Sequence, residues 1–212
     1  MSMTVIEWYK SGWRVFAANP LRLIAGFLIF AVLTGVLEVL NEALRIEGWF
    51  VHVVQIIIAP VAFAGWALFC LRTIRGERPA PVRVFDGFYL FRPAFIAGAI
   101  VAISFVIGLA LFVVPALLVA AIWGMWPFGV MDRRFGALDA LNYSVRITRG
   151  RRMELLIAAL IYLVLTFLGA LVFGVGLLVV GPWVGATYAV IYEDLIGGQI
   201  EKTGEVEYEV IE

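Results

Sequence analysis

The chain has 212 residues, of which 63% are hydrophobic and 15% are charged, and its mean hydropathy is +1.00. A water-soluble domain is typically about half apolar and about a quarter charged, so this composition excludes a soluble globular protein. The formal net charge is zero, but the charges are segregated along the chain, and we therefore interpret it as an integral membrane protein.

Six apolar segments are each long enough to cross a bilayer, which requires roughly 20 helical residues. Two stretches, 94–131 and 155–192, contain no charged side chain, and each would be about 57 Å long as one helix. Because this is nearly twice the thickness of the hydrocarbon core, each stretch is predicted to fold back as a hairpin, turning at 113–115 and at 174–176. The predicted spans are 21–40, 50–71, 94–113, 115–131, 155–174 and 177–193.

Basic residues gather in three segments that alternate with the pairs of spans. They lie at 10–22 before the first span, at 72–92 after the second, and at 133–152 after the fourth. The opposite connections carry Arg45 among glutamates, or no charge at all. The excess of positive charge on cytoplasmic loops therefore predicts that both termini are cytoplasmic, in a bacterial inner membrane. Since topology accounts for the arginines, we expect no nucleic-acid partner.

A short pattern recurs before the first two pairs of spans. GWRVFAANPLRLIAG, residues 12–26, resembles GFYLFRPAFIAG, residues 87–98: a glycine, a phenylalanine four residues later, and a proline at the start of a span. The fold class we predict is all-α integral membrane, with six transmembrane helices as three hairpins, each preceded by an amphipathic helix on the cytoplasmic face. Residues 1–198 form this domain, and 199–212 form an acidic cytoplasmic tail.

The segment before the third pair is DRRFGALDALNYSVRITRGRR, residues 132–152. Leu138, Leu141, Val145 and Thr148 recur at helical spacing and form an apolar stripe. Helices of this kind lie in the membrane interface with their basic side chains toward anionic headgroups. We therefore expect contacts with lipid headgroups or a partner from Arg133, Arg134, Arg146, Arg149, Arg151 and Arg152.

Motifs across nearly the whole chain resemble those of known membrane proteins: GWRVFAANP, VVPALLVAAIWGMWPFGVMD, ALDALNYSVRITRGRRMELL and GPWVGATYAVIYEDLIG. The chain is similar to an uncharacterised polytopic bacterial integral membrane family related to the membrane domain of glycerophosphoryl diester phosphodiesterases. The resemblance implies a shared architecture, without phosphodiesterase activity, because the metal ligands of that enzyme have no counterpart here. The positions that match the family pattern are Ala140, Leu141, Ser144, Arg149, Gly150, Pro182, Tyr192 and Glu193.

Four polar residues near the predicted outer face, Glu38, Glu42, His52 and Gln55, form the candidate polar site of the sequence. Ionisable groups inside a membrane usually face a partner or a cavity, which favours a cation or proton site. The alternative is that water at the outer interface satisfies all four. A metal requires three or four well-placed ligands, so one histidine with scattered glutamates predicts no metal, and we expect no cofactor.

No nucleophile, base and acid occur together in a pattern typical of catalysis, so the chain is predicted not to be an enzyme. The leading hypothesis is a scaffold, regulator or accessory to a partner in envelope maintenance or export. The alternative is a small transporter or channel, working as an oligomer, and a membrane-embedded lipid enzyme ranks third. A transporter predicts a polar cavity lined by His52, Gln55 or the proline-containing spans, whereas a scaffold predicts a well-filled bundle. The expected partners are membrane lipids, a membrane or cytoplasmic protein, or a second copy.

Overall fold

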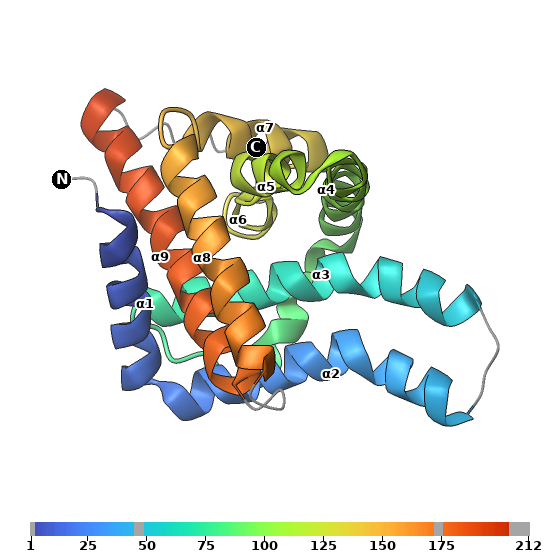
Figure 1. Ribbon diagram of the computed structural model, residues 1–212. Coiled ribbons are helices and arrows are strands. Elements are labelled where there is room, and N and C mark those ends of the chain that lie inside the picture. Colours follow the sequence, from blue (N-terminus) through green and yellow to red (C-terminus); the bar gives the residue numbers. More distant parts are fainter. Residues whose placement is uncertain (1–2, 45–48, 172–175, 204–212) are drawn as a thin grey trace.

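The computed structural model describes residues 3–44, 49–171 and 176–203 of the chain, and this part consists of helices and turns without strands (Figure 1). The helices are α1 (Val5–Ala18), α2 (Pro20–Leu44), α3 (Trp49–Ile74), the 3-10 helix η1 (Pro81–Leu90), α4 (Phe91–Leu111), α5 (Val113–Trp123), α6 (Trp126–Met131), α7 (Ala137–Ile147), α8 (Arg152–Leu171) and α9 (Leu177–Thr203).

The helices coincide closely with the apolar segments that the sequence predicts. Each predicted pair consists of helices that contact one another: α2 with α3, α4 with α5, and α8 with α9. The turn predicted at 113–115 lies a few residues earlier in the structure, since α4 ends at Leu111 and α5 begins at Val113. The second, at 174–176, falls almost wholly outside the described residues.

Among the described residues, four helical stretches are long and apolar enough to cross a membrane: His52–Ile74, Pro81–Leu111, Val113–Met131 and Arg152–Leu171. A fifth results if α1 and the first part of α2, which meet at a bend of 99°, are counted as one span. The structure therefore supports a multi-pass membrane protein with four or five candidate spans. The arrangement of exactly six spans remains a prediction.

Helix α1 begins at a capping box and ends just before a proline. The Thr4 hydroxyl accepts a hydrogen bond from the Glu7 amide, and the Glu7 carboxylate accepts one from the Thr4 amide at 2.7 Å. Helix α2 starts at Pro20, where the missing N–H would in any case have no helical partner. The chain bends sharply between these two helices. Helix α1 runs beside α9, whereas the α2–α3 hairpin crosses α8 and α9 at a steep angle (Figure 1).

Helix α1 lies along α9 in the opposite direction. Met3 contacts Asp194 near one end, and Gly12 contacts Thr187 nearer the other. A Cβ on Gly12 would lie 2.0 Å from the Thr187 hydroxyl oxygen, so a residue without a side chain is required there. The apolar face of α1, which we predicted to lie in the membrane interface, packs on α9 instead. Trp13 takes part in this contact although it is 45% exposed, because its ring meets that of Trp183 edge-on at 5.2 Å.

The element before the second hairpin, where an amphipathic helix is predicted, is the 3-10 helix η1, and it rests directly on α3. Two glycines permit this contact. A Cβ on Gly65 would lie 1.9 Å from the Val84 carbonyl oxygen, and one on Gly87 would lie 2.3 Å from the Val61 carbonyl oxygen. Backbone therefore packs against backbone at this point, a geometry that small residues allow between membrane helices.

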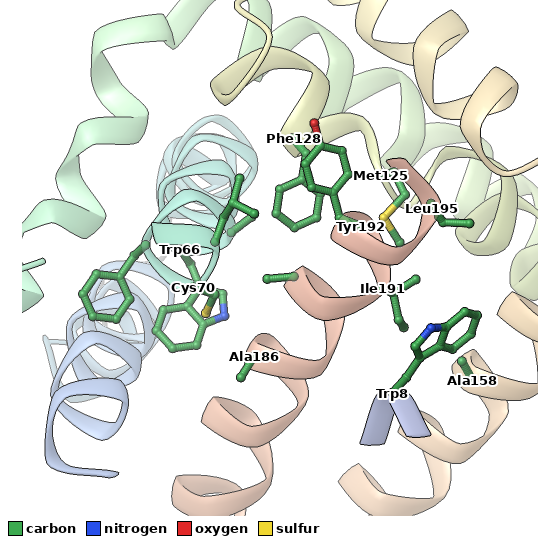
Figure 2. Packing of buried hydrophobic residues seen from close by; sticks show 14 of the residues in the cluster. Trp8, Trp66, Cys70, Met125, Phe128, Ala158, Ala186, Ile191, Tyr192 and Leu195 are labelled. Carbon is green, nitrogen blue, oxygen red and sulfur yellow. The ribbon is translucent and has the colours of Figure 1, made fainter. Parts of the chain in front are cut away.

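Helix α9 runs through the middle of the hydrophobic core (Figure 2). Trp66 and Cys70 lie on one side of it and Trp8 on the other. The rings of Tyr192 and Phe128 are stacked with their centroids 4.3 Å apart. Truncation of a fully buried aromatic side chain typically lowers the free energy of unfolding by about 3–5 kcal/mol. The packing of these rings therefore holds α9 in position against its neighbours.

Replacement of Gly65 by alanine tests the contact between η1 and α3. We expect Gly65→Ala to destabilise the protein by about 2 kcal/mol or more, because its Cβ would overlap the Val84 carbonyl oxygen. Gly35 has no atom within 4 Å of the corresponding position, so Gly35→Ala should leave stability unchanged or raise it slightly. Thermal unfolding of both variants in detergent measures the difference, and equal melting temperatures would contradict the contact.

Candidate functional site

A cavity of about 590 Å³ lies between the three helical hairpins. Residues of α1, α2, α3, α4, α5, α6, α8 and α9 line it, and none of the described lining residues is charged. Small-molecule sites in proteins typically have volumes of roughly 300–1,000 Å³ and mainly apolar walls with a few polar groups. The cavity has the size and the lining of a binding site for a mainly apolar molecule.

Aromatic rings of α2 and α3 form one wall of this cavity, and glycines of α9 make room for them. Phe30 and Trp66 stack with their ring centroids 6.1 Å apart, and Phe27 meets Trp66 edge-on at 5.7 Å. A Cβ on Gly181 would lie 2.3 Å from the Phe27 ring, and one on Gly185 would lie 2.6 Å from the Trp66 ring. Both glycines thus let helices of the same chain approach closely.

Two hydroxyl groups at the cavity wall are already hydrogen-bonded to the backbone. The Tyr9 hydroxyl donates to the Ala158 carbonyl oxygen at 2.7 Å, which ties α1 to α8. The Thr187 hydroxyl donates to the Trp183 carbonyl oxygen at 3.0 Å, within α9. These two groups stabilise the wall and are occupied.

Two other hydroxyl groups at the wall lack such partners. The Thr166 hydroxyl oxygen is buried and has no hydrogen-bond partner among the described residues. The ring of Tyr188 packs between Phe63 and Phe128, with centroid distances of 6.1 and 5.2 Å, and its hydroxyl makes no hydrogen bond within the described part of the chain. The Tyr188 hydroxyl is therefore free to bind a polar group of a ligand, and the buried Thr166 hydroxyl can do so if its side chain turns toward the cavity.

The predicted span 115–131 is interrupted beside the cavity, between α5 and α6. Helix α7 supplies hydrogen-bond partners for the backbone groups at this break. The Ser144 hydroxyl donates to the Ile122 carbonyl oxygen at 2.8 Å and accepts a hydrogen bond from the Met125 amide at 3.1 Å. Backbone polar groups at membrane depth must find partners inside the protein. Ser144 supplies them, so these two groups are not free to bind an ion.

The face of α7 that packs on this break overlaps the predicted apolar stripe only in part, since Leu141 and Thr148 of the stripe are buried. Ala140 is fully buried against Gly129, and Ser144 and Thr148 follow at one-turn spacing and are also fully buried. Leu138, which the pattern placed in the stripe, is 65% exposed. The sequence pattern misses this rotation of the helix because it scores apolar side chains and cannot see that the broken span requires small and hydroxyl residues.

A first ion-pair network joins the beginning of the chain to α9. The Asp194 carboxylate accepts hydrogen bonds from the Met3 amide at 3.1 Å and from the Trp8 indole at 2.8 Å, and it pairs with Arg151. The Arg151 guanidinium lies 4.7 Å from the Trp8 ring centroid and also pairs with Glu154 at 2.6 Å. Asp194 is only 7% exposed, and removing one partner of a buried pair typically costs about 3–5 kcal/mol. Arg151, which we predicted to contact headgroups or a partner, therefore serves an internal contact.

A second network joins the end of α3 to the end of α6 and to α9. Arg75 donates two hydrogen bonds to Asp132, at 2.6 and 3.1 Å, and one to Glu193 at 2.7 Å. The Tyr192 hydroxyl donates to the same Asp132 carboxylate at 2.9 Å. The hydrogen bonds to Asp132 raise the pKa of Arg75 above its ordinary value, against the opposing effect of burial. Two positions of the resemblance, Tyr192 and Glu193, thus anchor α9 to two other segments.

The remaining arginines of the predicted contact group have different surroundings. Arg134, Arg146 and Arg149 are exposed. Arg133 lies over a tyrosine ring at 5.9 Å, and the Nε atoms of Arg133 and Arg152 are buried with no hydrogen-bond partner among the described residues. Contacts with lipid headgroups or a partner stay a prediction.

The candidate polar site of the sequence is described only in part. The side chains of Glu38 and Glu42 lie outside the described residues. His52 is exposed, and Gln55 is half-buried, with its side-chain oxygen lacking a partner in the described part of the structure. Neither of these two side chains is among the described residues that line the cavity, so the structure does not bring His52 or Gln55 to this site.

No group of three or more histidine, cysteine, aspartate or glutamate side chains within the described residues is placed to hold a metal ion. No protein-family model, curated protein or solved structure matches the chain. The family resemblance inferred from the sequence motifs therefore stays a prediction.

Replacement of Ser144 by alanine tests its role at the helix break. We expect Ser144→Ala to destabilise the protein by about 1–2 kcal/mol, because the Ile122 carbonyl and the Met125 amide lose their partner. Ser104→Ala is the matched control, since the Ser104 hydroxyl makes no hydrogen bond in the described part of the chain. If thermal unfolding in detergent shows the same melting temperature for both variants, Ser144 does not satisfy the break.

Proposed function

We propose that the chain is a six-span protein of a bacterial inner membrane with both termini in the cytoplasm. The two spans beyond the clear candidates are α2 and α9, both of which pack in hairpins with candidate spans. The contacts of the basic segments support their placement on one side of the membrane, and the excess of positive charge assigns that side to the cytoplasm. Arg75 meets Asp132 and Glu193, and Arg151 meets Met3 and Asp194, so segments predicted on the cytoplasmic side contact one another.

We further propose that the protein acts without catalysis, as an accessory to a partner in envelope maintenance or export, by holding a mainly apolar molecule in its central cavity. The single observation that carries this proposal is the cavity of about 590 Å³ with its aromatic, uncharged lining. Pockets of this size that are mainly apolar and carry a few polar groups are typical of small-molecule binding sites.

A small transporter is the second candidate, and the same cavity favours it. Our sequence-based expectation for a transporter was a polar cavity, whereas the described lining is apolar and uncharged. Transport would therefore concern an apolar compound rather than an ion. Movement of a bound compound across the bilayer distinguishes a transporter from an accessory protein that only holds it.

Cysteine labelling tests the proposed orientation. Cys70, the single native cysteine, is buried and should react little. We expect Arg45→Cys to react with a membrane-impermeant maleimide in intact cells, and Arg149→Cys, at an exposed position, to react only after the cytoplasmic face is opened. Labelling of position 45 only from the cytoplasmic side would overturn the topology.

A tryptophan placed in the cavity tests the binding function. Val101 lines the cavity, whereas Val106 on the same helix is 64% exposed. We expect the purified wild-type protein and Val106→Trp to retain a bound apolar molecule in native mass spectrometry. In Val101→Trp the fraction of protein with the molecule bound should fall about tenfold or more, because the indole ring occupies the cavity. Equal retention by both variants, or no bound molecule in the wild-type protein, would count against the proposed function.

A further inference from the structure

The cavity reaches the surface of the protein at a face that is apolar. Phe105 on α4 and Tyr162 on α8 both line the cavity, yet they are 38% and 47% exposed. The side chains beside them on the same helices, such as Val106 and Leu163, are also exposed and apolar. In a membrane-spanning bundle such surfaces face lipid, so a molecule dissolved in the bilayer has a direct route into the cavity.

The lining restricts the charge of the occupant. None of the described lining residues carries a charge that would compensate an ionic group. An unpaired charge moved from water into such surroundings loses its hydration without a replacement, which is strongly unfavourable. The part of the ligand that enters the cavity is therefore neutral.

The lining also favours a ligand that carries a hydrogen-bonding oxygen atom. Thr166 on α8 and Tyr188 on α9 present hydroxyl groups that have no hydrogen-bond partner within the described residues. Each can donate to a carbonyl or ether oxygen, and each can accept from a hydroxyl group. A pure hydrocarbon would leave both hydroxyls buried and unpaired, a situation that typically costs about 1–3 kcal/mol per group.

From these three observations we propose that the cavity binds a neutral amphiphile that enters from the bilayer: an apolar chain bearing an uncharged carbonyl or hydroxyl oxygen. This inference rests on the proposed binding function and adds the chemical class of the ligand. The rings of Phe27, Phe30 and Trp66 contact the chain, and the hydroxyl of Tyr188 or of Thr166 binds the oxygen. Two sources share this chemistry, namely an acylglycerol and an isoprenoid quinone.

Binding of three probes with similar chains to the full-length protein in detergent tests the class. The probes are oleyl alcohol, oleate and octadecene, and native mass spectrometry measures their dissociation constants. We expect oleyl alcohol to bind at least about tenfold more tightly than oleate or octadecene. Equal or tighter binding of oleate or octadecene overturns the inference. Separate titrations with dioleoylglycerol and menaquinone then distinguish the two sources by their affinities.

Conservative variants test the two hydroxyls. At least one of Tyr188→Phe and Thr166→Val should weaken oleyl alcohol binding by about three- to tenfold, and both should leave octadecene binding unchanged. Thr166→Ser keeps the hydroxyl and should bind like the wild-type protein, which separates the hydrogen bond from the folding of the helix. If both hydroxyl variants bind oleyl alcohol normally while Val101→Trp still blocks it, this inference fails and the proposed function stands.

Discussion

The carboxylate of Asp194 is the contact on which the arrangement of the helices depends most. It binds the Met3 amide, the Trp8 indole and Arg151, and it thereby joins α1, the start of α8 and the end of α9. Its neighbour Glu193 pairs with Arg75 and brings in the end of α3. Because these charges are partly withdrawn from water and held by several partners, each pair depends on the others. The two networks thus gather segments that are far apart in sequence at one end of the bundle.

The two ion-pair networks determine where the walls of the cavity lie. With α1 held by Asp194, Tyr9 reaches the Ala158 carbonyl oxygen on α8, and both residues line the cavity. Farther along α9, Gly181 and Gly185 let the rings of α2 and α3 approach closely, and the space that remains is the cavity. Polar groups at the end of the bundle and small residues within it therefore act together: the former fix the helix ends, and the latter fix the distances between helices.

The sequence predicts the helical segments well because twenty-residue apolar stretches have few alternatives in a membrane. It does not predict the cavity, which is built from residues of eight helices whose packing no local pattern encodes. Ser144 stands out as a motif residue, but its role becomes visible only when α7 is placed beside the break between α5 and α6. Predictions that involve the side chains of Glu38 and Glu42, or the part of the tail 199–212 that follows residue 203, fall outside the described residues.

The central claim is that the cavity holds a neutral apolar molecule from the bilayer, and an experimental structure of the protein in lipid nanodiscs tests it most directly. We expect elongated density that belongs to no protein atom, lying against Phe30 and Trp66 and within hydrogen-bonding distance of the hydroxyl of Thr166 or Tyr188. A cavity that is closed by rearranged side chains, or one that contains only water, would contradict the account.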